Sequence, residues 1–210
     1  MEVKRLGLLE RIGGALIDPE STFKAMVESG VGVGEALLCL LAFTVAAGFT
    51  FSPVVLKLAE VFAGFAGWLG FPGYGALTPS LAWIAASILI VLLVFGNLVF
   101  WALSAGIAHL TAKYAFKGEG SYAGVLTAYG YSYSAFTPFL VGVTLTNLMG
   151  LALLLPLFTL ISAAWFLILW VVAVKTVHRI DAGRGFISAF LTPLTVYLLI
   201  VFALVRGLAW

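Results

Sequence analysis

The chain consists mainly of long apolar runs separated by short polar or glycine-rich segments. The runs are continuous, unlike the alternating strands of roughly ten residues in an outer-membrane barrel, and each is long enough for a helix that crosses a bilayer. The pattern therefore predicts an all-α polytopic membrane protein, a bundle of five transmembrane helices. The predicted spans are 35–56, 81–112, 122–145, 151–174 and 186–205.

Residues 1–34 mix apolar and charged positions, which is typical of amphipathic helices that lie on a membrane surface. Asp18 and Pro19 predict the start of a second short helix, with aspartate at the N-cap and proline at the first helical position. Gly30 is expected to end that helix. This region is predicted to be an interfacial collar, and the alternative is a docking surface for a cytosolic partner.

Glycine, proline and aromatic residues crowd the segment 63–79, which follows the first span. This composition predicts an irregular interfacial loop, either with one amphipathic turn or with a re-entrant piece.

Composition agrees with a membrane location. Of 210 residues, 63% are hydrophobic and 10% are charged, whereas a soluble domain carries about 25% charged residues. A net charge of +2 is too small for a nucleic-acid-binding protein. Glutamine is absent and only two asparagines occur, which weakly favours a thermophilic source.

Basic residues are distributed unevenly between the two predicted sides of the membrane. The positive-inside rule places the richer side in the cytoplasm, which predicts a multi-pass protein of the cell membrane with its N-terminus inside and its C-terminus outside. Nine of the 11 basic residues lie on that side: Lys4, Arg5, Arg11, Lys24, Lys113, Lys117, Lys175, Arg179 and Arg184.

A charged turn leads into the third span. Gly118 and Gly120 flank Glu119, and these glycines are expected to adopt backbone conformations closed to other residues. Ser121 is placed to cap the helix that follows.

The third span is rich in aromatic and hydroxyl side chains. Four aromatic residues recur at helical spacing on one face: Tyr122, Tyr129, Tyr133 and Phe136. Hydroxyl groups lie on another face, where they are expected to bond across helices or to the helix backbone: Thr127, Tyr131 and Ser134. Gly130 permits close approach of a neighbouring helix. Pro138 removes a backbone donor, which predicts a kink and a freed carbonyl near Ser134.

These features resemble the prokaryotic branch of the Yip family, small five-span proteins named in eukaryotes for interaction with Ypt/Rab GTPases. The resemblance rests on the Gly-x-Gly turn, the capping serine, Gly130-Tyr131-Ser132 and Pro138, and it covers about residues 10–205. Further features fit in the same order: Asp18-Pro19 with Phe23, Trp101 with His109, and Trp165, Trp170 and His178. The resemblance implies a membrane scaffold or adaptor, and the trafficking role of eukaryotic relatives is not carried over.

Two groups of residues are candidate functional sites. The first is an interhelical polar and aromatic cluster, comprising Asn97, Trp101, Ser104, His109, Tyr129, Gly130, Tyr131, Ser132, Ser134 and Pro138. The second is a set of candidate contacts for a partner or for anionic lipid headgroups, comprising Lys117, Glu119, Lys175, His178, Arg179 and Arg184.

The two histidines are predicted to have structural roles. No other histidine, cysteine or carboxylate lies near His109 in the sequence, so it is expected to bond a backbone carbonyl rather than bind a metal or relay protons. His178 and Asp181 are three residues apart and are expected to pair as helical neighbours.

No catalytic motif occurs, and we expect neither an enzyme, nor a metal site, nor a cofactor. The apparent lack of charge in the deep core also argues against an ion-coupled transporter. The predicted function is a non-enzymatic scaffold that organises membranes or binds partners, among which are the bilayer, a second copy of the chain and another membrane protein. The alternative is a small channel or lipid-translocating conduit lined by polar residues of the second and third spans.

Overall fold

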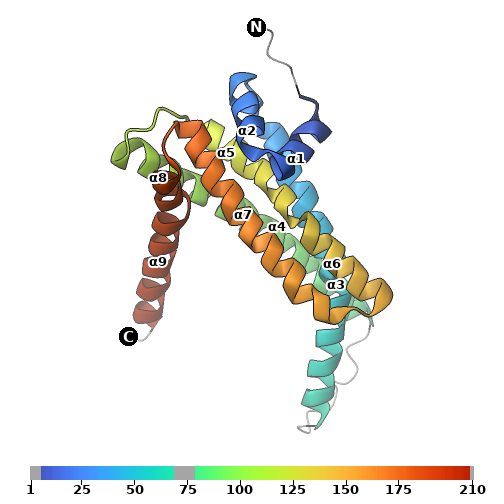
Figure 1. Ribbon diagram of the computed structural model, residues 1–210. Coiled ribbons are helices and arrows are strands. Elements are labelled where there is room, and N and C mark those ends of the chain that lie inside the picture. The colour runs from blue at the N-terminus through green and yellow to red at the C-terminus, as the bar shows by residue number, and fades with distance from the viewer. Residues whose placement is uncertain (1–5, 69–78, 209–210) are drawn as a thin grey trace.

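The computed structural model describes residues 6–68 and 79–208, and every regular element in those ranges is helical, which confirms the predicted all-α class (Figure 1). The α-helices are α1 (Leu8–Ile17), α2 (Pro19–Glu28), α3 (Val33–Trp68), α4 (Pro79–Leu110), α5 (Tyr122–Ser132), α6 (Thr137–Met149), α7 (Leu155–His178), α8 (Ala182–Phe186) and α9 (Thr192–Leu208). π-Helical turns follow α4 at Thr111–Ala115 and α8 at Ile187–Leu191, and 3-10 turns precede α6 at Tyr133–Phe136 and α7 at Ala152–Leu154.

Helices α1 and α2 lie across one end of the bundle (Figure 1). The predicted start of α2 is confirmed, because the Asp18 carboxylate accepts a hydrogen bond from the Ser21 N–H at 3.3 Å and Pro19 is the first helical residue. Gly30 lies just beyond the end of α2 with φ of +67°, a conformation that favours glycine. Phe23 of α2 is fully buried. This end of the fold is therefore tied to the bundle by apolar packing.

Helix α3 is longer than predicted. Residues 63–68, which we expected in an irregular loop, continue the helix, whereas 69–78 lie outside the described residues. The helix passes through Pro53, which removes the N–H that the Phe49 carbonyl would otherwise accept. The Ser52 hydroxyl donates to that carbonyl at 2.7 Å instead, so a local side chain satisfies the group that proline leaves unpaired.

The third predicted span is broken in the middle. Helix α5 passes into the 3-10 turn, and α6 then continues from Thr137. The Ser134 carbonyl, freed by Pro138, accepts the Thr137 hydroxyl at 2.7 Å, and the Phe139 N–H donates to the Ser162 hydroxyl of α7 at 2.9 Å. The predicted freeing of the Ser134 carbonyl is thus confirmed, and a neighbouring helix supplies one of the replacement bonds.

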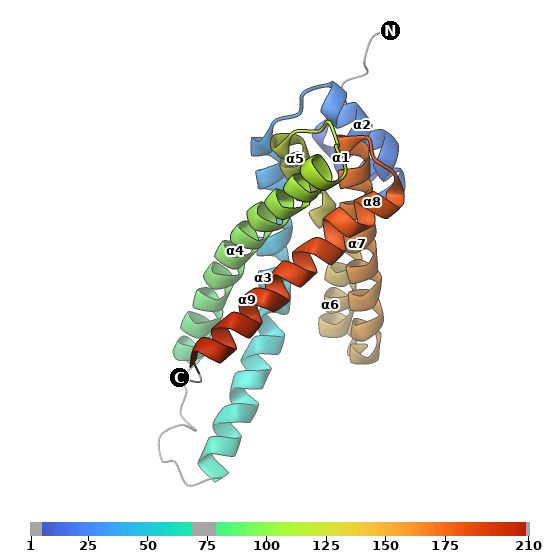
Figure 2. The ribbon, with the colours of Figure 1, turned by 90° about the vertical axis from the view of Figure 1, so that its left-hand side faces the viewer.

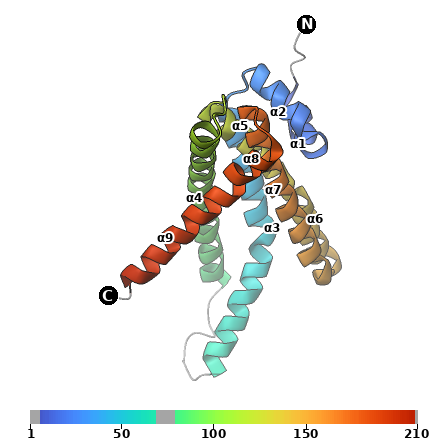
Figure 3. The ribbon, with the colours of Figure 1, turned by 60° about the vertical axis from the view of Figure 1, so that its left-hand side comes forward.

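Four helical stretches among the described residues are long and apolar enough to cross a membrane: Val33–Thr50, Ala86–Ala115, Leu155–His178 and Ala182–Gly207. The segment 122–145 is not among them because its break leaves two shorter helices. The five-span count therefore remains approximate. Helix α9 diverges from α7, and the far end of α3 projects beyond its neighbours (Figures 2 and 3).

Candidate functional site

Helix α5 lies at the centre of the packing, in contact with α3, α4 and α7. It approaches α3 closely at Gly130, where an added Cβ would lie 2.6 Å from the Ala36 carbonyl oxygen. Real Cβ atoms are not found at such a distance from a backbone oxygen. Gly130 therefore sets the separation of α3 and α5, as small residues do in membrane bundles.

One face of α4 forms hydrogen bonds with three other elements. The Trp101 indole N–H donates to the Leu126 carbonyl of α5 at 3.0 Å. The Ser104 and Tyr197 hydroxyls are 2.8 Å apart and join α4 to α9. Asn97 Oδ1 accepts the Tyr133 hydroxyl at 3.2 Å, across to the 3-10 turn. These bonds hold α4 against the centre of the fold.

Aromatic rings fill the space between α5, the 3-10 turn and α7. Tyr129 and Trp170 stack with centroids 4.2 Å apart and an interplanar angle of 6°. The ring of Phe166 contacts those of Tyr133, Phe136 and Trp170 at centroid distances of 5.3, 5.2 and 4.7 Å. Contacts of this kind add about 0.5–1.5 kcal/mol each beyond burial, so they lock α5 to α7.

The end of the bundle near α2 brings the two histidines together. His109 Nδ1 lies 3.1 Å from His178 Nε2, and the Gly120 N–H donates to His178 Nδ1 at 3.2 Å. His178 is 1% exposed. The Glu119 N–H donates to the His178 carbonyl at 3.2 Å. The turn at Gly118, Glu119 and Gly120 is called the glycine turn below. The end of α4, the glycine turn and the end of α7 thus meet at the His178 imidazole.

The hydrogen bonds indicate which nitrogen of His178 carries the proton. Since the Gly120 N–H occupies His178 Nδ1, the neutral His178 ring carries its proton on Nε2 and donates it to His109 Nδ1. Protonation of either ring would place two N–H groups against each other. The arrangement therefore favours two neutral rings.

Sequence reasoning was wrong about both histidines. His109 meets His178 rather than a backbone carbonyl, and Asp181 pairs with Arg184 rather than with His178. Residues 109 and 178 are 69 positions apart, so no local pattern could have indicated their contact. Among the described residues, no group of three or more histidine, cysteine, aspartate or glutamate side chains is arranged to hold a metal ion.

The glycines of the turn serve a different purpose from the predicted one. Neither Gly118 nor Gly120 has a positive φ, and the left-handed residue of the turn is Lys117, with φ of +56°. A Cβ on Gly118 would lie 2.7 Å from His178 Nδ1, and one on Gly120 would lie 2.5 Å from the Val177 carbonyl oxygen. The glycines are therefore required for close approach to α7.

An ion pair joins α1 to the first residues of α3. Arg11 Nη2 lies 2.9 Å from Glu35 Oε2, and the Tyr131 hydroxyl donates to the same oxygen at 3.0 Å. The Arg11 side chain is 12% exposed, and its guanidinium lies 5.9 Å from the centroid of the Tyr131 ring. The Tyr131 ring and hydroxyl thus connect the collar to the buried third span.

The remaining candidate residues of the third span are buried. Ser132 and Ser134 are both fully buried, and the Ser132 hydroxyl donates to the Ala128 carbonyl at 2.9 Å. Tyr129 and Tyr131 are also fully buried. The side chains that we considered as the lining of a conduit are thus enclosed by protein, with Asn97 as the partly exposed exception.

Three of the charged candidates, Glu119, Lys175 and Arg179, line a crevice of about 750 Å³ between α2, the glycine turn and the end of α7. Lys175 pairs with Glu20 at 2.7 Å, and Arg179 lies 3.6 Å from Glu119. Its charged lining residues are Glu20, Lys24, Glu28, Glu119, Lys175 and Arg179. Arg184 pairs with Asp181 at 3.0 Å and does not line the crevice. Sequence reasoning missed Glu20, Lys24 and Glu28, because only the fold brings α2 beside α7.

Asp181 caps α8, since its carboxylate accepts the Arg184 N–H at 2.9 Å. That bond, assisted by the Arg184 guanidinium, lowers the pKa of Asp181 below the ordinary value of 3.8. The ionised Asp181 carboxylate therefore stabilises the cap at pH values above its ordinary pKa. This stabilisation is lost as the pH falls through the lowered pKa.

We expect Asp181→Asn, which keeps a capping oxygen without a titrating group, to remove this pH dependence. The measurement is amide hydrogen exchange of α8 between pH 2 and pH 6, after correction for the intrinsic pH dependence of exchange. Asp181→Ala should lose protection at every pH. An identical pH profile for wild type and Asp181→Asn would contradict the assignment.

A family model described as the Yip1 domain matches residues 13–205 of the chain. No curated protein matches the chain significantly. No solved structure matches it either.

Proposed function

Because the chain belongs to the Yip1 domain family, we propose that it is a non-enzymatic membrane scaffold that holds a partner at the crevice between α2, the glycine turn and α7. The observation that carries the proposal is the location of the polar groups. Most of those in the bundle are enclosed by protein, with Asn97 partly exposed, whereas most of the charged residues gather at the end near α2, with Lys57, Glu60 and Arg206 as the exceptions. A protein arranged in this way binds a partner at its surface, rather than conducting a substrate along a polar path through the bundle.

The charges of the crevice define the kind of partner that fits. It is lined by three cations and three carboxylates. An anionic headgroup alone would face the carboxylates, whereas a protein segment bearing both signs can pair with each side. Lys24 and Glu28 are absent from the ion pairs found among the described residues, so they remain available for such pairing. Lys117 and Arg184 lie outside this lining and are our candidates for headgroup contact.

The distribution of basic residues supports the orientation of the scaffold. With the N-terminus inside, the crevice faces the cytoplasm of a cell whose plasma membrane holds the protein. The partner is then a cytosolic protein or the cytosolic segment of another membrane protein.

Cross-linking in the native membrane, followed by mass spectrometry, tests the scaffold. Lys24→Glu places a fourth carboxylate in the crevice and is expected to reduce the yield of the cross-linked partner at least tenfold, because one attractive pair becomes repulsive. Arg206→Glu, an exposed change on α9, serves as the matched control and should leave the yield unchanged. Equal yields from both variants would contradict binding at the crevice.

The conduit alternative is tested separately by reconstitution in liposomes. A scaffold gives neither ion flux nor lipid scrambling above protein-free vesicles. Flux that changes in Asn97→Leu or Tyr131→Phe would instead support a polar path through the second and third spans.

A further inference from the structure

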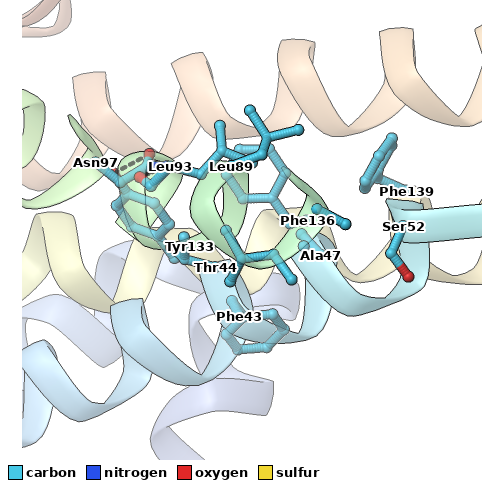
Figure 4. Close-up of a pocket in the computed structure, with 13 residues that line it drawn as sticks. Phe43, Thr44, Ala47, Ser52, Leu89, Leu93, Asn97, Tyr133, Phe136 and Phe139 are labelled. Carbon is cyan, nitrogen blue, oxygen red and sulfur yellow. Dashed lines mark hydrogen bonds between the residues drawn. The ribbon is translucent and has the colours of Figure 1, made fainter. Parts of the chain in front are cut away.

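Two places inside the bundle differ in the side chains that surround them. The cavity of about 150 Å³ between α3, α4 and the segment that joins α5 to α6 has a mostly apolar lining, and none of the described side chains that line it is acidic, basic or a histidine (Figure 4). The contact between His109 and His178 joins the two histidines of the chain. Histidine has an ordinary pKa of about 6.5, so a moderate change of pH acts on this contact rather than on the cavity.

The imidazole of His178 lies between two neighbours that fit its neutral form. Its Nδ1 accepts the Gly120 N–H at 3.2 Å, and its Nε2–H donates to His109 Nδ1 at 3.1 Å. A proton added to His109 Nδ1 would face the His178 Nε2–H, and one added to His178 Nδ1 would face the Gly120 N–H. A change of tautomer at His178 only moves the conflict from one bond to the other. Each protonated form of the pair therefore breaks at least one of the two bonds.

The surrounding charges do not compensate for a protonated ring. The elements around the pair carry these charged or titratable groups: Lys113, Lys117, Glu119, Tyr122, Lys175 and Arg179. Lys113 places a like charge beside both rings. The carboxylate of Glu119 lies 3.6 Å from Arg179, and among the described residues no carboxylate forms a hydrogen bond with either imidazole. A proton on the pair is therefore accommodated by separation of the groups that now meet.

The glycine turn connects this pair to the charged crevice. A Cβ on Gly118 would lie 2.7 Å from His178 Nδ1, so the turn packs directly on the imidazole. Glu119 and Gly120 line the crevice together with Val177 of α7. Movement of the imidazole against the turn therefore displaces part of the crevice wall.

We propose that His109 and His178 form a proton-operated latch on the glycine turn. With both rings neutral, the turn is fastened to α7 and the crevice keeps its shape. On acidification a proton enters at the partly exposed His109, the turn detaches, and the crevice releases its partner. Acid favours the open form because the closed form excludes a proton that the open form binds. Control of partner binding rests on the proposed scaffold function, whereas the latch itself is a property of the free protein.

Amide hydrogen exchange of the full chain in phospholipid nanodiscs, between pH 8 and pH 4, tests the latch. The readout is the protection of residues 117–122 after correction for the intrinsic pH dependence of exchange. Because opening takes up one proton, we expect protection of the turn to fall about tenfold per pH unit below the titration of the pair. Residues 198–207 of α9, which contain no histidine, serve as the internal reference.

Replacement of both histidines by asparagine removes the titrating rings. The Oδ1 atom of Asn at position 178 lies near the position of histidine Nδ1 and can still accept the Gly120 N–H, so the turn of this double variant should be equally protected at every pH. His109→Asn alone should shift the loss of protection to lower pH, because the partly exposed ring no longer takes up the proton. Glu119→Gln is the matched control, since it removes the carboxylate of the turn and should keep the pH dependence of the wild type.

Any of three results would overturn the latch. They are constant protection of the turn in the wild type, the wild-type pH dependence in the double variant, and loss of that dependence in Glu119→Gln. Control of binding is measured by light-activated cross-linking in the native membrane, where the yield should fall at the pH that opens the turn, and an unchanged yield would contradict it. Failure of the scaffold itself is recognised separately, by equal yields from Lys24→Glu and Arg206→Glu at pH 8.

Discussion

Replacement of Gly130 by alanine is expected to destabilise the bundle by about 2 kcal/mol. The new methyl group would lie 2.6 Å from the Ala36 carbonyl oxygen and 2.7 Å from the Ala36 Cβ. Both atoms are fixed to the backbone of α3, so the clash is relieved only if α3 and α5 move apart. Overpacking of this kind costs about 1–3 kcal/mol, and the intrinsic preference of alanine for helix returns up to about 1 kcal/mol.

Gly96→Ala provides the control for this prediction. Gly96 lies in α4, and an added Cβ would meet nothing within 4 Å, so only the helix preference acts and stability should rise slightly. The measurement is unfolding of the detergent-solubilised protein in increasing denaturant, followed by tryptophan fluorescence. If the two alanine variants unfold at the same denaturant concentration, the contact between α3 and α5 does not limit packing.

Replacement of His178 by leucine is expected to cost about 3 kcal/mol. The buried imidazole accepts from the Gly120 N–H and donates to His109 Nδ1, and leucine can do neither. Each group left without a partner carries a desolvation cost of about 1–3 kcal/mol, which exceeds the net strength of an average hydrogen bond. The glycine turn should also become less ordered, because the His178 side chain is one of its attachments to α7.

Substitutions of His109 test the proton assignment directly. The Oδ1 atom of asparagine occupies nearly the position of histidine Nδ1 and is an acceptor, so His109→Asn should keep the bond from His178 and change stability by less than about 1 kcal/mol. His109→Leu removes the acceptor and should cost about 2 kcal/mol. Equal losses in these two variants, measured by the same unfolding experiment, would show that His109 does not act as the acceptor.

The features that the sequence determined by itself are those whose cause lies within a few residues. Asp18 and Ser121 cap helices because each side chain reaches an N–H three residues ahead. Pro138 frees the Ser134 carbonyl because a proline nitrogen carries no hydrogen to donate. The apolar runs predicted an all-helical membrane protein, since hydrocarbon leaves helix formation as the way to satisfy their backbone groups.

A local rule failed where another side chain compensated for it. Pro53 lies inside α3, which continues to Trp68, and the Ser52 hydroxyl bonds the carbonyl that the proline leaves unpaired. The glycines near His178 suggested an unusual backbone, although what they provide is space for α7. In both cases the residue type was informative, but its consequence depended on atoms outside the motif.

Only the tertiary structure decided which polar groups meet. The bonded histidines are 69 residues apart, and Tyr131 and Glu35 are 96 residues apart. The crevice beside α2 and the cavity between α3 and α4 likewise arise from helices that are distant in sequence. A hydrophobic pattern specifies which residues enter the bilayer, but it carries little information about which face of one helix contacts another. That choice depends on close packing at residues such as Gly130, and the candidate sites follow from it.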